Sequence, residues 1–142
     1  MKIAILNGPN LNLLGKREPE TYGKMDLPQL EQSIADQFQD VEFVFYQSNL
    51  EGELINFMQQ MGADKTPVVF NPGGYSHTSV ALADAIAGSQ AQVVEVHISN
   101  IHAREPFRHT SLTGAVSCGM ISGFGLQSYI LGVQFLLGQS KS

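Results

Sequence analysis

The stretch PVVFNPGGYSHTSVALADAIAG, residues 67–88, contains an apolar run, a polar connection and a helical pattern in succession. The apolar run ends at Asn71 and is short and continuous, as expected for a strand that is buried on both faces. After the polar, glycine-containing connection, a helix is expected from Val80 through Ile86, ending at Gly88. A strand followed by a helix is the building unit of a parallel sheet.

The same alternation extends along the whole chain. The five strand candidates are Lys2–Asn7, Glu42–Gln47, Pro67–Asn71, Gln92–Ile98 and Val116–Ser122. The other helical patterns cover residues 27–38 after the N-cap candidate Asp26, residues 54–61 before Gly62, and the largely apolar residues 126–137. Five strands that alternate with helices predict an α/β fold: a flavodoxin-like, doubly wound, five-stranded parallel sheet with helices on both faces. We expect residues 1–142 to form a single catalytic domain.

The composition narrows the class of function. Hydrophobic residues make up 43% of the 142 residues and charged residues 15%, which is typical of a globular protein. The net charge of −5 argues against a binder of nucleic-acid backbones, but it leaves room for a small anion held by a few arginines. No signal peptide is recognisable at the start, so we expect a cytoplasmic protein without membrane partners. The single cysteine, Cys118, lies in an apolar run and is expected to be a buried, inert thiol.

Ligands of such folds bind outside the carboxyl ends of the strands, and polar residues gather there in this sequence. The connection of residues 8–24 after the first strand is long enough to be an active-site lid, and it carries Asn10, Arg17 and Tyr22. Its glycine spacing matches neither a dinucleotide fingerprint nor a phosphate loop. Arg17 and Tyr22 are either an exposed charge and a packing aromatic, or a tyrosine whose pKa is lowered by the guanidinium so that tyrosinate acts as a base.

His97 is the most informative histidine. It lies near the end of a predicted buried strand, two residues after Glu95 and therefore on the same strand face. A carboxylate in that place can fix the tautomer of the imidazole and stabilise its charged form. A structural core histidine is the alternative, but the polar segment that follows favours an acid–base role.

Other kinds of site receive less support. His97, His102 and His109 are spaced five and seven residues apart, which is typical of neither zinc hydrolases nor zinc fingers, so we expect no metal and no cofactor. No nucleophile elbow surrounds any serine. The lysines lie in expected loops, in the tail or at the start of the first strand, which disfavours a Schiff base.

The residues alone therefore indicate proton abstraction beside a carbonyl with loss or movement of a hydroxyl, on a small polar anion. Two alternatives remain open. One is a non-catalytic module of the same fold that binds a small anion. The other is a metal-dependent hydrolase that uses the histidine cluster. A module that only binds an anion does not need a tyrosine base and its arginine. The spacing of the histidines disfavours the metal-dependent hydrolase.

Five segments resemble the type II 3-dehydroquinate dehydratases, over essentially the whole chain. They are NGPNLNLLGKREPETYG (7–23), QSNLEGELI (47–55), NPGGYSHTSVALADAI (71–86), EVHISNIHAREPFRHTS (95–111) and GFGLQSYILG (123–132). The resemblance implies dehydration of 3-dehydroquinate to 3-dehydroshikimate by anti elimination through an enolate, without metal or Schiff base. That step belongs to the shikimate pathway of aromatic amino acid biosynthesis, and quinate breakdown uses it as well.

The resemblance also implies catalytic roles. Tyr22 takes the C2 proton as tyrosinate, and Arg17 lowers its pKa. Asn10 holds an ordered water that stabilises the enolate. His97, oriented by Glu95, protonates the departing C1 hydroxyl.

Further residues are implied in substrate binding. Asn71, together with Ile98 and Ser99, holds the carboxylate of the substrate, and His77 and Arg108 bind the ring hydroxyls. The family assembles as a dodecamer of four trimers, and Asp84 is expected to reach the site from a neighbouring subunit. The sequence departs from the family pattern at Gly74 and Ser76, where alanine and threonine are commoner, without removing a catalytic group.

Overall fold

The computed structural model describes residues 1–16 and 18–140, with residues 21 and 22 described by their backbone alone. Its strands are β1 (Lys2–Asn7), β2 (Glu42–Gln47), β3 (Val68–Asn71), β4 (Val93–His97) and β5 (Gly119–Ser122). They form one sheet in the order β2-β1-β3-β4-β5, and all neighbouring strands are parallel. This is the flavodoxin-like, doubly wound order, so the predicted fold class is confirmed.

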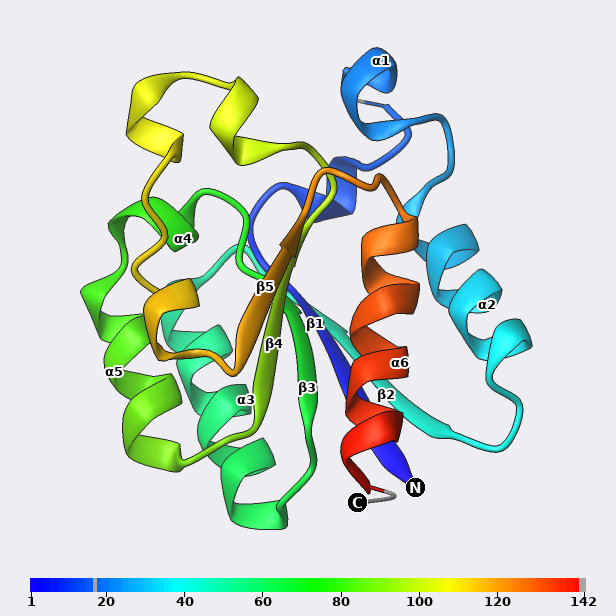
Figure 1. Ribbon diagram of the computed structural model, residues 1–142, viewed down its shortest axis with the longest axis vertical. Coiled ribbons are helices and arrows are strands. Elements are labelled where there is room, and N and C mark those ends of the chain that lie inside the picture. The colour runs from blue at the N-terminus through cyan, green and yellow to red at the C-terminus, as the bar shows by residue number, and fades with distance from the viewer. Residues whose placement is uncertain (17, 141–142) are drawn as a thin grey trace.

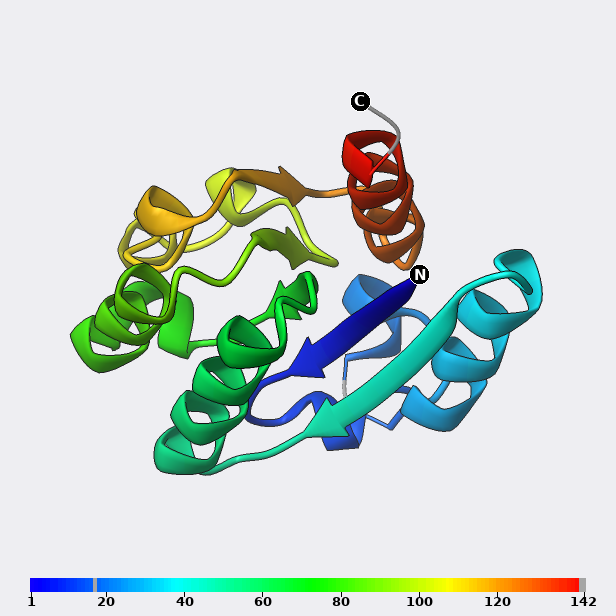
Figure 2. The same ribbon diagram turned by 90° about the horizontal axis from the view of Figure 1, so that it is seen from below.

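In the described part of the chain, long helices cover both faces of the sheet (Figures 1 and 2). They are α2 (Leu27–Gln37) and α6 (Gln127–Ser140) on one face, and α3 (Glu51–Asp64) and α5 (Val80–Ser89) on the other. Strand β1 supplies both cores because its side chains alternate. Ile3 and Ile5 pack with α2 and α6, whereas Ala4 and Leu6 pack with α3 and α5.

The start of α2 agrees with the sequence. The Asp26 carboxylate accepts a hydrogen bond from the backbone N–H of Gln29, and the Gln29 side chain accepts one from the backbone N–H of Asp26. This reciprocal arrangement satisfies backbone donors that a helix start leaves unpaired. The expected N-cap is therefore confirmed.

Two helices continue past the glycines that were expected to end them. Helix α3 includes Gly62 and ends before Lys65, which itself adopts the left-handed conformation with φ 55°. Helix α5 likewise includes Gly88 and ends before Gln90, with φ 57°. Gly62 is required for packing instead, because a Cβ there would lie 2.4 Å from the backbone oxygen of Ser89.

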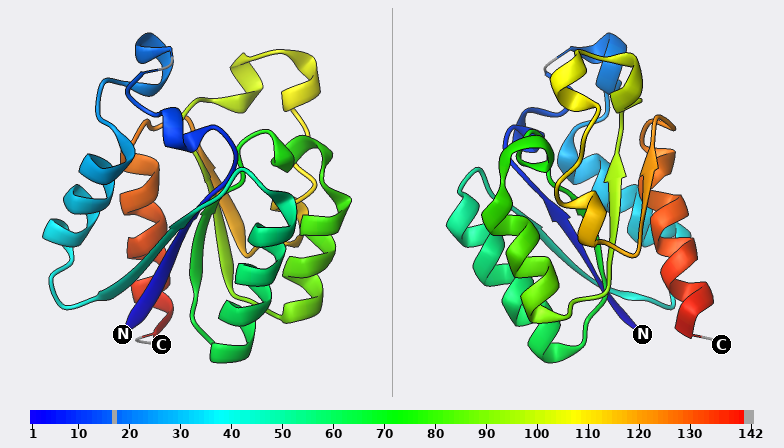
Figure 3. Two further views of the ribbon diagram at one scale, coloured as in Figure 1. Left: turned by 180° about the vertical axis from the view of Figure 1, so that it is seen from behind. Right: turned by 60° about the vertical axis from the view of Figure 1, so that its left-hand side comes forward.

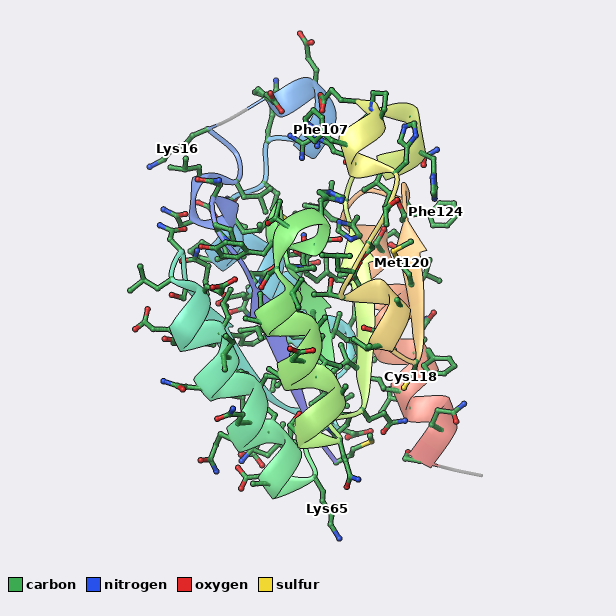
Figure 4. The ribbon with its side chains drawn as sticks, turned by 90° about the vertical axis from the view of Figure 1, so that its left-hand side faces the viewer. Lys16, Lys65, Phe107, Cys118, Met120 and Phe124 are labelled. Atoms are coloured by element: carbon green, nitrogen blue, oxygen red, sulfur yellow. The ribbon has the colours of Figure 1, made fainter. Side chains whose placement is uncertain are left out.

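Strand β5 is shorter than predicted and lies at the edge of the sheet. Residues Gly114–Val116 form a 3₁₀ turn, η4, and the strand begins only at Gly119. Cys118 is exposed, so the expectation of a buried thiol was wrong. Figure 4 shows Cys118, Met120 and Phe124 along this outer edge. Cys118 comes just before the strand and belongs to neither of the two hydrophobic cores.

Short elements follow the carboxyl ends of the strands. They are η1 (Leu11–Leu13), α1 (Pro19–Tyr22), α4 (Tyr75–Thr78), η2 (Ile101–Ala103) and η3 (Pro106–Arg108). The views in Figures 1 and 3 place α1, η2 and η3 together beyond that end of the sheet. The expected lid of residues 8–24 thus contains η1 and α1. In the part of the chain that the structure describes, no helix combines the length and apolar character needed to cross a membrane.

Candidate active site

A cavity of about 130 Å³ opens at the carboxyl end of the sheet. Seven residues expected at the site from the sequence line it: Asn10, Asn71, His77, His97, Ile98, Ser99 and Arg108. Arg104 lines it as well, although it was not among the expected site residues. Among the described residues, the lining includes two arginines and two histidines but no aspartate or glutamate. This local balance favours an anionic ligand despite the net charge of −5.

Glu95 and His97 form a buried pair at the end of β4. His97 Nε2 lies 2.7 Å from Glu95 Oε2, and Glu95 is completely buried while His97 is only 5% exposed. Because an ionised carboxylate can only accept, Nε2 carries a proton toward Glu95. His97 lines the cavity, so its Nδ1 is the ring nitrogen left for a ligand. The sequence-based expectation that these two side chains interact is confirmed.

Three hydroxyl groups also contact the Glu95 carboxylate, and none of them was expected at the site from the sequence. Ser111 Oγ donates to Oε2 at 2.5 Å, Ser76 Oγ lies 3.3 Å from the same atom, and the Thr113 hydroxyl donates to Oε1. Burial acts to raise the pKa of Glu95. The hydrogen bond and charge of His97, with the Ser111 and Thr113 hydroxyls, outweigh it, so the pKa lies below its usual value of 4.5.

His77 lies beside His97, with 6.2 Å between the ring centroids. Its Nδ1 is 2.9 Å from the backbone oxygen of Thr110, and because a carbonyl only accepts, Nδ1 carries the proton. In the neutral ring, Nε2 then remains as an acceptor for a substrate hydroxyl. His77 is held by α4, and Thr110 belongs to the segment after η3, so two separate segments determine its orientation.

Asn71 is oriented from behind by buried polar groups. Its Nδ2 donates to the Tyr129 hydroxyl at 2.8 Å, and its Oδ1 accepts from the backbone N–H of Gly73 at 3.1 Å. The Tyr129 hydroxyl in turn donates to Asn7 Oδ1 at 2.5 Å. Tyr129 is fully buried, and this burial raises its pKa above the usual value of 10.0 even though Asn71 donates to its oxygen.

Asn10 is held by residues at and just after the end of β2. The backbone N–H of Asn10 donates to Asn49 Oδ1 at 2.9 Å, and Gln47 Nε2 donates both to that oxygen and to the backbone oxygen of Gly8, each at 3.1 Å. Asn10 adopts the left-handed conformation with φ 72°, which asparagine tolerates better than most residues. The first residues of the 8–24 connection are therefore anchored to the end of β2.

The arginines approach the cavity from the segment after β4. Arg104 Nη1 lies 3.5 Å from Ser99 Oγ, next to the expected seat for a carboxylate. Arg108 Nε donates to Glu105 at 2.5 Å, a contact that uses one of the five donors of the guanidinium. Its guanidinium also lies 5.1 Å from the centre of the Phe107 ring.

Three further site residues were expected from the sequence. Arg17 lies outside the described residues, as does the side chain of Tyr22. Asp84 is on α5, and it borders a separate hollow with Gly62 and Gly88 rather than the cavity. Within a single chain, Asp84 therefore lies apart from the expected site residues that line the cavity.

Neither of the other two histidines lines the cavity, nor does any lysine that the structure describes. His102 and His109 lie with ring centroids 5.9 Å apart, and His109 Nε2 donates to the backbone oxygen of Arg104 at 2.9 Å. Within residues 1–16 and 18–140, no three histidine, cysteine, aspartate or glutamate side chains are grouped as metal ligands. Figure 4 shows Lys65 at the end of the molecule opposite Phe107.

The arrangement resembles known proteins over nearly its whole length. Residues 1–137 match the family model described as dehydroquinase class II. The chain belongs to the class II dehydroquinase family. A 3-dehydroquinate dehydratase from Brucella canis is 50% identical over 141 residues, which cover 98% of this chain and 90% of that protein.

Solved class II dehydroquinases have the same fold. The type II dehydroquinase from Butyrivibrio crossotus is 42% identical with a TM-score of 0.93, covering 96% of this chain and 97% of the other. The corresponding enzyme from Propionibacterium acnes is 40% identical with the same TM-score, covering 96% of both chains. The resemblance found in the sequence is therefore confirmed.

Proposed function

We propose that this protein dehydrates 3-dehydroquinate to 3-dehydroshikimate. The observation that carries the proposal is the buried Glu95–His97 pair at a cavity whose described lining has two arginines and no acidic side chain. Such a site offers a proton donor next to a seat for an anion. Membership of the class II dehydroquinases and the name of the Brucella canis relative support the choice of substrate.

The proposed chemistry is an anti elimination through an enolate. Tyr22, as tyrosinate, removes the C2 proton, and the electron pair of that C–H bond forms the enolate. The enolate then restores its carbonyl, and its electron pair forms the C1–C2 double bond as the C1–oxygen bond breaks. His97 donates its Nδ1 proton to the departing hydroxyl, which leaves as water. Glu95 stabilises the charged imidazole while it holds that proton, because a nearby carboxylate favours the protonated form.

Binding residues complete the proposal. Asn71, Ile98 and Ser99 receive the substrate carboxylate, while His77 and Arg108 hold ring hydroxyls. Asn10 holds the water that stabilises the enolate, and Arg17 favours ionisation of Tyr22. We place the reaction in the shikimate pathway, in the cytoplasm, in a dodecamer of four trimers in which Asp84 is supplied by a neighbouring subunit.

The direct test is incubation with 3-dehydroquinate while the ultraviolet absorbance of the conjugated enone product is followed. We expect turnover by the unmodified protein and losses of about 10²-fold or more in kcat for His97→Ala and for Tyr22→Phe, the usual scale for general acid–base groups. His102→Ala is the matched control, since His102 is exposed and does not line the cavity. Folded, assembled protein that binds the substrate without forming product would support the anion-binding alternative instead.

A further inference from the structure

We propose that Ser111 and Thr113 are positioning residues for the acid step: their hydroxyls hold the Glu95 carboxylate in place behind His97 and keep it ionised. This inference rests on the proposed function, in which His97 is the acid. Neither hydroxyl belongs to the residues that line the cavity, so both act through Glu95 rather than on the substrate.

The direction of each hydrogen bond follows from the neighbours of Ser111. Its oxygen accepts from the backbone N–H of Gly114 at 2.8 Å and from the Ser76 hydroxyl at 2.7 Å. With both acceptor positions used, the single Ser111 proton is directed to Glu95 Oε2 at 2.5 Å. The Thr113 hydroxyl donates to the other carboxylate oxygen, Oε1. The carboxylate is therefore held at both oxygens, and Oε2 also accepts from His97.

The ionised state of the Glu95 carboxylate depends on these hydrogen-bond donors because water does not reach the carboxylate. Glu95, Ser76 and Thr113 each have no exposed surface. Moving a carboxylate out of water favours its neutral form, whereas hydrogen bonds donated to it favour the charged form. A neutral carboxyl would carry its own proton and would no longer stabilise a protonated His97. Removing a hydroxyl therefore lowers the fraction of His97 that is protonated and ready to donate, without touching the substrate.

The local backbone is arranged for this contact. A Cβ on Gly114 would lie 2.9 Å from Ser111 Oγ and 3.3 Å from Glu95 Oε2, so a side chain there would crowd the bond. The backbone N–H of Leu112 donates to the backbone oxygen of Ser76 at 2.7 Å, which ties this segment to α4. The same segment holds His77 through the Thr110 carbonyl. Residues 110–114 thus orient both histidines of the site.

The decisive variants are Thr113→Val, which keeps the branched shape but removes the hydroxyl, and Thr113→Ser, which restores it. We expect Thr113→Val to lower kcat roughly 10-fold or more, the scale of a lost hydrogen bond to a charged group, with KM changed less than about 3-fold. Its kcat relative to wild type should fall further as the pH is lowered toward the usual carboxyl range, because the pKa of Glu95 rises in the variant. Thr113→Ser should recover most of the lost kcat.

A second measurement does not depend on turnover. In protein labelled with ¹³C at the glutamate carboxyls, the Glu95 signal is assigned by its loss in Glu95→Gln and is then titrated. We expect the Glu95 pKa to be below its usual value in the wild type and higher in Thr113→Val and in Ser111→Ala. Ser111→Ala also serves if Thr113→Val does not fold. Thr66→Val is the matched control, a buried threonine before the amino end of β3, and should leave kcat and the titration unchanged.

The outcomes separate this inference from the proposed function. If the wild type turns over 3-dehydroquinate and Thr113→Val keeps both its kcat and its Glu95 titration, the positioning role is wrong while the dehydratase stands. A loss of kcat without a change in titration, or without recovery in Thr113→Ser, would show a purely structural role and also overturn the inference. If the wild type is inactive, the proposed function fails. An unchanged Glu95 titration in Thr113→Val would then show separately that the hydroxyls do not keep Glu95 ionised.

Discussion

The hydroxyl of Tyr129 joins the last helix to the asparagines that end β1 and β3. It donates to Asn7 and accepts from Asn71, and all three side chains are buried. Within the described residues, no buried side-chain nitrogen or oxygen lacks a hydrogen-bond partner. The Asn71 amide, expected to meet the substrate carboxylate, is therefore oriented by a residue of α6, far away in the sequence.

At this scale we predict that Tyr129→Phe destabilises the protein at neutral pH by about 1–3 kcal/mol, because two buried amide groups lose a partner. Urea unfolding measures the change. Tyr46→Phe is the control, since its ring stacks on Phe57 with centroids 4.9 Å apart, and we expect a change within about 0.5 kcal/mol.

The same variant carries a pH dependence. The pKa of Tyr129 is raised in the folded state. The neutral hydroxyl therefore contributes fully to the free energy of unfolding below the unfolded pKa of 10.0, and this contribution is lost as the pH rises toward the folded pKa. The stability difference between wild type and Tyr129→Phe should therefore shrink above about pH 10. A difference that stays constant across this range would contradict the buried, neutral phenol.

At the scale of the elements, the requirement for glycine at one position of α3 comes from the packing of α5 against it and not from α3 itself. Gly62 lies inside α3, where glycine is unfavourable, yet its missing side chain lets the last turn of α5 approach. Gly52 lies in the same helix, and a Cβ added to it would meet open space. The two glycines therefore differ in what surrounds them rather than in the helix to which they belong.

We predict opposite effects for the two glycines of α3. Gly62→Ala should destabilise by about 1–3 kcal/mol, because its Cβ would lie 2.4 Å from a backbone oxygen and one helix must move. Gly52→Ala should be neutral or stabilise by up to about 1 kcal/mol, since it only reduces backbone freedom. Urea or thermal unfolding of both variants checks this, and equal effects would show that helix propensity alone determines the outcome.

At the scale of the whole molecule, Asp84 lies apart from the expected site residues that line the cavity. Asp84 borders a hollow between α3 and α5, away from the cavity that contains His97. Several large apolar side chains are exposed on the isolated chain, among them Phe107, Phe124 and Val80, which is consistent with further burial in an assembly.

If a neighbouring subunit supplies Asp84, co-expression of Asp84→Ala with His97→Ala should restore activity that neither variant has alone. Random assembly should give up to roughly a quarter of wild-type activity, because a site is active only where an intact His97 of one chain meets an intact Asp84 of its neighbour. Co-expression of Tyr22→Phe with His97→Ala is the control and should restore none, since both residues are expected in one chain. A mixture no more active than its parents would place Asp84 outside the site.

Local patterns in the sequence determined the alternation of strands and helices, the helix start at Asp26 and the pairing of Glu95 with His97. Each of these depends on residues only two or three positions apart, so the period of the strand or the geometry of a cap is sufficient. The family resemblance added the expected substrate and the expected roles of the lid residues.

Only the tertiary structure decided which polar groups stand behind those residues. Thr113 and Ser111 reach Glu95 across 18 and 16 positions, Asn49 reaches Asn10 across 39, and Tyr129 reaches Asn7 across 122. The exposure of Cys118 outside both cores and the close approach of α5 to Gly62 were likewise decided by the tertiary structure. Contacts between distant residues leave no local period, and burial depends on what covers a segment once the sheet has formed.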